Sequence, residues 1–217
     1  MLFRSNYAGA AEAVRYLHGL GHREIATITG PVDSLPAMQR LAGYEEAIRE
    51  LGMTTRPEYI ETGDFFQDTG YACAARLAAL PERPTAVFVA GDEMAIGAMH
   101  ALSDAGVSIP GDMAVVGFDD IEAASLVRPA LTTIAQDPIA LGAAAVEALL
   151  MLVDVPAVVV ERTDRSRANR EDGADRADRA DRVDSADLIE PTKAPAPFPP
   201  RTVPTRLVSR QSCGAKR

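Results

Sequence analysis

The segment that decides the fold is residues 84–136, with the sequence PTAVFVAGDEMAIGAMHALSDAGVSIPGDMAVVGFDDIEAASLVRPALTTIAQ. It contains two short apolar runs, residues 86–90 and 113–118, and each is followed directly by acidic residues. Between them, residues 93–105 have the spacing of an amphipathic helix and end at a glycine. Apolar runs that alternate with helical periodicity predict a β-α-β unit with a buried parallel sheet.

The acidic residues follow the ends of the two predicted strands. Asp92 comes after the first run, and Asp119 and Asp120 come after the second. In open parallel sheets, ligands bind beyond the carboxyl ends of the strands. The sequence therefore predicts the rim of a ligand pocket at this edge.

The composition narrows the class of protein. The 217 residues include 22 Lys and Arg against 31 Asp and Glu, a net charge of −9, so the chain as a whole repels nucleic acid and anionic membranes. Its cysteines, Cys73 and Cys213, have no metal or disulfide spacing, as is usual in a reducing cytosol. We find no signal peptide and no apolar run of the roughly 20 residues that span a bilayer. We therefore expect a cytoplasmic protein.

Strands and helices alternate along the first two thirds of the chain. Runs with helical spacing end at Gly or Pro, and short β-rich runs end in turn residues. This alternation predicts an α/β fold, a mostly parallel sheet flanked by helices. Outside the quoted segment, we expect helices at residues 10–20, 36–51, 69–80 and 134–153, and strands at residues 24–29 and 59–61.

The sequence changes character after residue 153. Residues 162–187 repeat Ala, Asp and Arg, and residues 191–204 are rich in proline. Such segments cannot offset their chain entropy by burial, so we expect residues 164–200 to be disordered, with an exposed charged helix as the alternative. Residues 205–209, TRLVS, predict a returning strand. The disordered stretch would then be an insertion in a loop.

Four segments carry a family resemblance: LGHREIATITGP, QRLAGYEEAIRELG, the quoted segment and PTRLVSRQSCG. Together they resemble the effector-binding core of the lactose-repressor-like (LacI/GalR) family of bacterial transcription regulators. The resemblance implies a partial effector-binding domain made of residues 1–153 and 203–214. Its expected fold is the C-terminal lobe of a type I periplasmic-binding-protein-like domain.

Members of that family begin with a helix-turn-helix headpiece, a hinge helix and the first half of a two-lobed domain. None of these is recognisable in this sequence, which on this interpretation is N-terminally truncated. The helix expected at residues 134–153 would belong to the other lobe, and residues 205–209 would return to the C-terminal lobe. The chain would then hold half of a ligand cleft and would reach DNA only through a headpiece it lacks.

The resemblance assigns four ligand-binding residues. Arg40 precedes the LAGY motif, and its guanidinium suits hydroxyls or a carboxylate. Asp119 is the first Asp of GFDD, where a carboxylate accepts sugar hydroxyls. Phe65 follows Gly-Asp, where the family often has an aromatic ring on a sugar face, and Gln136 matches a hinge-strand position near the cleft.

Ordinary structural roles remain open for several of these residues. Arg40 could be an exposed helix arginine, and Phe65 could belong to the core, with Phe66 as its competitor for the ring contact. Asp119 could cap the helix that follows it, although Asp120 fits that role better.

Two further positions bear on the site. We expect Asp92 to cap the helix over residues 93–105. Gly91 departs from the family pattern, which often has an asparagine whose side chain bonds the ligand. Glycine removes that contact.

Enzyme chemistry has little support. His100 lies far from His18 and His22 in the sequence, and no nucleophile elbow or phosphate-binding glycine loop is present. A phosphoryl-accepting Mg²⁺ site would need an Asp after the first strand and a Lys near a later one, but that strand ends in Thr29-Gly30. The lysines are Lys193 and Lys216, far from the predicted sheet edge. We expect no catalytic residue, metal or cofactor.

The resemblance thus implies a sensing domain for a small effector, a sugar or polyol, that works as a homodimer. Ligand would close the cleft, and the closure would reach the headpieces through the dimer interface. That interface is implied near residues 126–131 and the helix that starts at Glu93. Two alternatives stay open: a truncated product without function, and a module that dimerises with full-length relatives without binding DNA.

Overall fold

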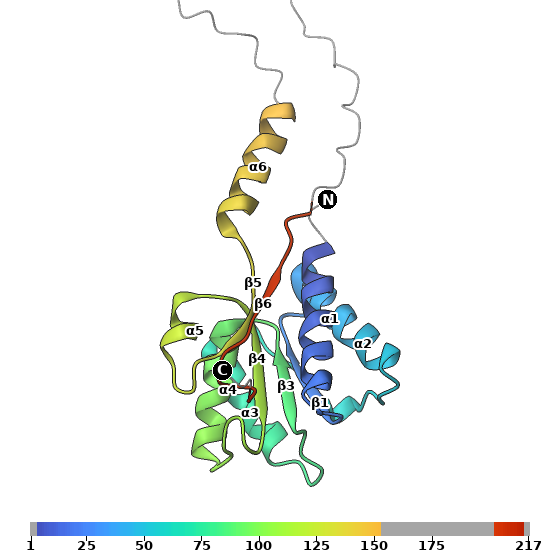
Figure 1. Ribbon diagram of the computed structural model, residues 1–217, viewed down its shortest axis with the longest axis vertical. Helices are drawn as coiled ribbons and strands as arrows, with labels where there is room; N and C mark the ends of the chain where they lie inside the picture. The colour runs from blue at the N-terminus through green and yellow to red at the C-terminus, as the bar shows by residue number, and fades with distance from the viewer. Residues whose placement is uncertain (1–3, 153–201, 215–217) are drawn as a thin grey trace, which may run out of the picture. The chain divides into compact units, whose positions relative to one another are not determined.

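The computed structural model describes residues 4–152 and 202–214, and in them six strands form one sheet. The first five strands run parallel, and the sixth is antiparallel to the fifth. This sheet confirms the predicted α/β fold. In order across it, the strands are β2 (Ile60–Thr62), β1 (Ile25–Thr29), β3 (Ala86–Val89), β4 (Ala114–Asp119), β5 (Thr132–Ala135) and β6 (Arg206–Val208) (Figure 1).

Helices cover both faces of the sheet. Helices α1 (Arg4–Gly19) and α2 (Leu35–Glu50) pack on one face, and α3 (Gln67–Ala78) and α4 (Asp92–Asp104) pack on the other (Figure 1). None of the described helices is long and apolar enough to cross a membrane. The remaining elements are the 3-10 helix η1 (Pro57–Tyr59) and the helices α5 (Glu122–Leu126) and α6 (Pro138–Leu152).

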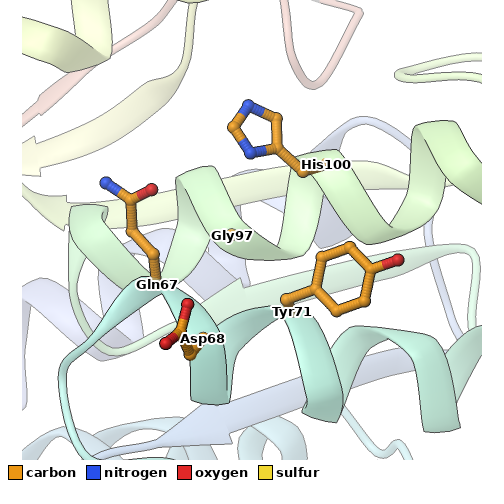
Figure 2. A pocket seen from close by; sticks show the side chains of 5 residues that line it. All are labelled: Gln67, Asp68, Tyr71, Gly97 and His100. Carbon is orange, nitrogen blue, oxygen red and sulfur yellow. The ribbon is translucent and has the colours of Figure 1, made fainter.

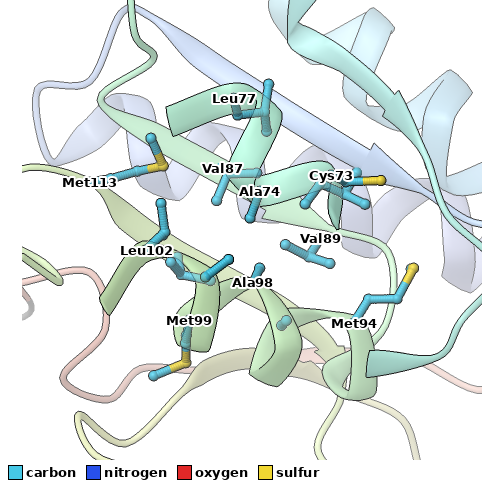
Figure 3. Close-up of a cluster of buried hydrophobic side chains, with 14 of the residues drawn as sticks. Cys73, Ala74, Leu77, Val87, Val89, Met94, Ala98, Met99, Leu102 and Met113 are labelled. Atoms are coloured by element: carbon cyan, nitrogen blue, oxygen red, sulfur yellow. The ribbon is translucent and has the colours of Figure 1, made fainter. Parts of the chain in front are cut away.

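The central strands are buried on both faces, which explains their unbroken apolar runs. On β3, Val87 and Val89 belong to the apolar cluster beneath α3 and α4 (Figure 3). Their neighbours Ala86 and Phe88 point to the opposite face, beneath α1 and α2. The period-two alternation of a strand therefore divides one apolar run between two cores.

Helices α3 and α4 approach each other closely at two glycines. A Cβ atom at Gly70 would lie 2.2 Å from the Met94 carbonyl oxygen. One at Gly97 would lie 2.0 Å from the Gln67 carbonyl oxygen. Each helix thus presents a glycine to the backbone of its partner, and this contact fixes the separation of the two helices.

The C-terminal segment completes the sheet, which confirms the strand predicted at residues 205–209. After β6, the Ser212 hydroxyl donates to the Val115 carbonyl (2.6 Å) and accepts from the Thr132 amide (2.8 Å). Cys213 is buried beside Thr132, in the core beneath α1. The segment therefore lies within the core of the domain.

The predicted start of the helix expected at residues 134–153 is wrong. Residues 132–135 form β5, which pairs in parallel with β4, and α6 begins only at Pro138. The β-branched Thr132, Thr133 and Ile134 favour a strand, and proline favours the first turn of a helix. The insertion expected at residues 164–200 lies outside the described residues.

The chain divides into two compact units at α6, and residues 144–152 belong to the second. In α6, Ile139, Val146, Leu149 and Leu150 are exposed, each by more than half of its surface.

Candidate functional site

Three of the four predicted residues meet at the carboxyl edge of the sheet. Arg40 comes from α2, Asp119 ends β4, and Gln136 directly follows β5. One Asp119 oxygen, Oδ1, accepts hydrogen bonds from Arg40 Nη2 (3.2 Å) and from Gln136 Nε2 (2.5 Å). A carboxylate, a guanidinium and an amide are thus joined where parallel sheets bind ligands.

Arg40 is buried, so the exposed-arginine alternative is wrong. Its side chain is 7% exposed, and it donates through Nε to Asn6 (3.0 Å) and through Nη1 to the Ala90 carbonyl (2.6 Å). The guanidinium lies 3.8 Å from the centre of the Phe118 ring. Burial lowers the pKa of Arg40, and the neighbouring Asp119 opposes that shift. Three hydrogen bonds of Arg40 thus go to protein groups, and one of them holds Asp119.

Asp119 is the accessible member of the cluster, with 35% of its side chain exposed. Among the described residues, its second oxygen, Oδ2, has no hydrogen-bond partner. Burial raises the pKa of Asp119, and the contacts with Arg40 and Gln136 oppose the rise. An oriented carboxylate with one free oxygen can accept a hydroxyl group.

Phe65 lies at the same edge. A Cβ atom on Gly30 would lie 2.2 to 2.7 Å from the Phe65 ring, so the ring rests directly on that glycine. A Cβ atom on Gly91 would lie 3.3 Å from the ring and 3.8 Å from Asp119 Oδ2. The Phe65 ring and Asp119 Oδ2 thus both lie within 4 Å of the position that a Cβ atom on Gly91 would occupy. Phe66, in contrast, is 70% exposed.

The backbone at Phe65 is in the left-handed region, with φ of 75°. Such a conformation is unusual for a bulky residue and needs support from its neighbours. Asp64 supplies it: its carboxylate accepts the Phe66 amide (2.9 Å) and the Thr69 hydroxyl. The loop that carries the ring is therefore fixed to the start of α3.

Both helix caps predicted from acidic residues are wrong. Asp92 lies inside the first turn of α4, and its carboxylate points inward, where it accepts the Thr133 hydroxyl (2.7 Å) and the Ile121 amide (3.0 Å). Asp120 forms an ion pair with Arg210 (2.6 Å), and α5 has no side-chain cap. Burial and the partners across the sheet outweigh local capping at these positions.

Asp92 leads to a pH prediction. Burial raises the pKa of its carboxyl from 3.8 to about 7, despite the hydrogen bonds from Thr133 and Ile121. Because the folded state then binds the proton more tightly, this contribution to stability is present at low pH and is lost as pH rises through about 7. The free energy of unfolding, relative to that of Asp92→Asn, should fall by about 2 kcal/mol between about pH 5 and pH 8.

Urea unfolding of both proteins at several pH values checks this prediction. The charged groups that face Asp92 are Asp119 and Arg40, and both remain in the variant, so their effects largely cancel. A constant difference across the range would contradict the prediction.

The cavities lie away from the centre of this cluster. A groove of about 240 Å³ runs along the outer surface of α3 and α4, and its lining residues include Tyr71 and His100 (Figure 2). It contains none of the four predicted residues. A hollow of about 410 Å³ borders Gln136, Asp120 and Arg206. Of these two hollows among the described residues, the second adjoins the carboxyl edge.

Asn6 supports the site but was not assigned to it from the sequence, whereas Asp92 was placed at the pocket rim with a capping role that it does not have. Asn6 orients Arg40 from α1, across a long stretch of chain. A signal for Asp92 was available at Gly117, where a Cβ atom would lie 2.1 Å from the Asp92 carboxylate. The glycine of GFDD therefore makes room for the buried acid.

The fold and this edge define a ligand-binding domain of the periplasmic-binding-protein type. The family model described as "Periplasmic binding protein-like domain" matches residues 14–171. The chain belongs to this family, in its LacI-type branch of transcription regulators.

The similar proteins support the assignment to the LacI-type branch. The ribose operon repressor of Escherichia coli K12 is 42% identical over 154 residues, which are 71% of this chain and 47% of the repressor. The HTH-type transcriptional repressor CytR of the same strain is 40% identical over 149 residues, 69% of this chain and 43% of CytR. The chain therefore spans about half the length of the curated relatives it matches.

Solved structures agree. A sugar-binding LacI-family regulator from Escherichia coli, complexed with phosphate, matches with a TM-score of 0.72 at 27% identity, over 96% of this chain and 61% of that one. A LacI-family regulatory protein from Chloroflexus aggregans matches with a TM-score of 0.65 at 38% identity, over 68% of this chain and 53% of that one.

Proposed function

We propose that the chain is the effector-sensing part of a LacI-type transcription regulator and that its effector is a sugar or related polyol. The observation that carries the proposal is that the free Oδ2 of Asp119 and the Phe65 ring both lie beside Gly91, within 4 Å of the position of an added Cβ. A sugar offers hydroxyls to a carboxylate and a C–H face to an aromatic ring. The name of the ribose operon repressor and a solved regulator–cellobiose complex, 28% identical, support this class of effector.

In this proposal, the residues of the site have different roles in binding. Arg40 and Gln136 hold Asp119 through Oδ1, so the carboxylate is oriented before the ligand arrives and Oδ2 stays available. Preorganisation reduces the ordering cost of binding. The Phe65 ring, fixed through Asp64, would pack on the ligand's apolar face. We expect a homodimer to transmit closure to DNA-binding headpieces of the kind the family carries.

D-Ribose is the probe that tests the proposal. We expect the chain alone to bind it with a dissociation constant in the millimolar range, because water competes for each hydrogen bond at an open edge. A chimera that adds the preceding half of the ribose operon repressor should bind at least a hundredfold more tightly. Isothermal titration, with a panel of pentoses and hexoses, measures both. A chimera that folds but binds no sugar would refute the proposal.

The second candidate function is an interaction module that dimerises with full-length relatives. The apolar surface of α6 favours it, because Ile139 is 84% and Leu150 is 62% exposed. Exposed apolar surface of this kind promotes association.

We therefore expect the chain to self-associate at tens of micromolar, and the double variant Val146→Gln, Leu150→Gln to associate less. Multi-angle light scattering after size-exclusion chromatography measures this. The control is Val32→Gln, which changes an exposed valine outside α6. A stable monomer at these concentrations would contradict the expectation.

A further inference from the structure

The carboxylate of Asp92 is buried beneath the candidate site and does not reach the solvent. Asp92 is 0% exposed, although aspartate side chains in proteins are usually charged and lie at the surface. It links three elements: its own helix α4, the turn after β4 through the Ile121 amide, and β5 through the Thr133 hydroxyl. Gly117 lacks a side chain where this carboxylate lies.

The turn that Asp92 holds has an unusual backbone. Asp119 and Asp120 are consecutive residues with positive φ, 116° and 61°. L-residues rarely adopt such angles, and surrounding contacts must impose them when they occur. The Ile121 amide is the first donor after this pair, and Asp92 accepts it at 3.0 Å. The contact fixes the exit of the turn, while Arg40 and Gln136 hold the Asp119 side chain.

We propose that Asp92 is a positioning residue for ligand binding: its buried carboxylate holds the turn after β4 so that Asp119 Oδ2 faces the ligand edge. The ligand itself rests on the proposed function. The positioning role concerns the turn, and it can be measured without ligand.

The contact uses both oxygens of the Asp92 carboxyl group. Both of its oxygens accept, so it can serve the Thr133 hydroxyl and the Ile121 amide together. An asparagine of the same shape would turn an NH₂ group toward one of these donors. Burial also raises the pKa of Asp92, so the ionised form costs stability.

The test compares Asp92→Asn with a matched control in the full chain. The control is Asp112→Asn, because the Asp112 carboxylate likewise accepts one backbone amide and one hydroxyl, both from Ser108. Asp112 precedes β4, at the other end of that strand. Amide hydrogen exchange followed by NMR reports the turn, and NMR titration with D-ribose reports the site.

In Asp92→Asn, we expect the Ile121 amide to exchange at least tenfold faster, while core amides of β3 keep their protection. The D-ribose concentration that half-saturates the shift of the Gln136 side-chain amide should rise at least fivefold. The control should change neither quantity. Thr133→Val removes one partner of the carboxylate without adding a donor. It should change the Ile121 exchange rate and the half-saturating ribose concentration in the same direction, but by less. This variant replaces Asp92→Asn in the test if Asp92→Asn does not fold.

Each outcome of these experiments supports or overturns the positioning role of Asp92. Unchanged Ile121 exchange in the variants would overturn the proposal. Loss of global stability with unchanged ribose affinity of the folded protein would also overturn it, because Asp92 would then be only structural. If the wild-type chain and the chimera show no response to ribose, the proposed function fails for that sugar. The exchange experiment then still accepts or rejects the role of Asp92 in the turn.

Discussion

Gly97→Ala is expected to lower the free energy of unfolding by about 3 kcal/mol. The added methyl group would lie 2.0 Å from the Gln67 carbonyl oxygen, 2.8 Å from its carbon and 3.0 Å from its Cα atom. All three are backbone atoms of α3, so no side chain can rotate away. The helices must separate, and the apolar cluster between them and the sheet would lose contacts. Urea unfolding monitored by circular dichroism measures the change.

Gly19→Ala is the matched control. Gly19 ends α1, and apart from its chain neighbours and its own helix backbone, nothing lies within 4 Å of the position of an added Cβ. The substitution should change stability by less than about 1 kcal/mol and could raise it, because alanine favours helix. Equal effects at Gly19 and Gly97 would show that the close approach of α3 and α4 is not what stabilises this half of the domain.

Asp119→Ala in the ribose-binding chimera is expected to cost about 2 to 4 kcal/mol of binding free energy. In a closed site, the ligand hydroxyls that Asp119 accepts would lose their partner and also lose water. Arg40 would keep its bonds to Asn6 and to the Ala90 carbonyl, so we expect the fold to survive. Isothermal titration with D-ribose, together with urea unfolding, separates the two effects.

Two further variants sharpen this test. Asp119→Asn keeps the shape and one acceptor, so its loss should be smaller than that of Asp119→Ala. Asp112→Ala removes an exposed carboxylate at the other end of β4 and should leave binding unchanged. If the chimera binds ribose equally well with Asp119→Ala and with Arg40→Ala, the site assignment is wrong, while the fold stands.

The fold could be predicted from local patterns because its strands are buried on both faces. The apolar runs that form β3 and β4 stand out against their turns, and the segment from Ala86 to Asp119 has the predicted order. The start of α6 could not be placed in this way. Residues 132–135 are apolar or β-branched and lead into an Ala-rich helix, so only pairing with β4 shows where the strand ends.

The sequence led to three residues that lie together in the structure, but it did not predict their contacts. Arg40, Asp119 and Gln136 come together as the strand order requires. Sequence spacing could not show that Arg40 is buried by Asn6 and Phe118, since those contacts form across helices. For the same reason, local reasoning favoured a helix cap for Asp92. Its partners on β5 and in the turn after β4 become visible only in three dimensions.

The position of β6 has a consequence for biosynthesis. A ribosome makes β1 to β5 in the first part of the chain, but the partner of β5 appears only when residues 206–208 emerge. Until then the backbone of β5 remains an open edge, which nascent chains expose to wrong partners. The places of Ser212 and Cys213 in the core are filled last of all. The pairing of β5 with β6 therefore forms after the rest of the sheet has been made, and a chain that stops before residue 206 would keep the edge of β5 open.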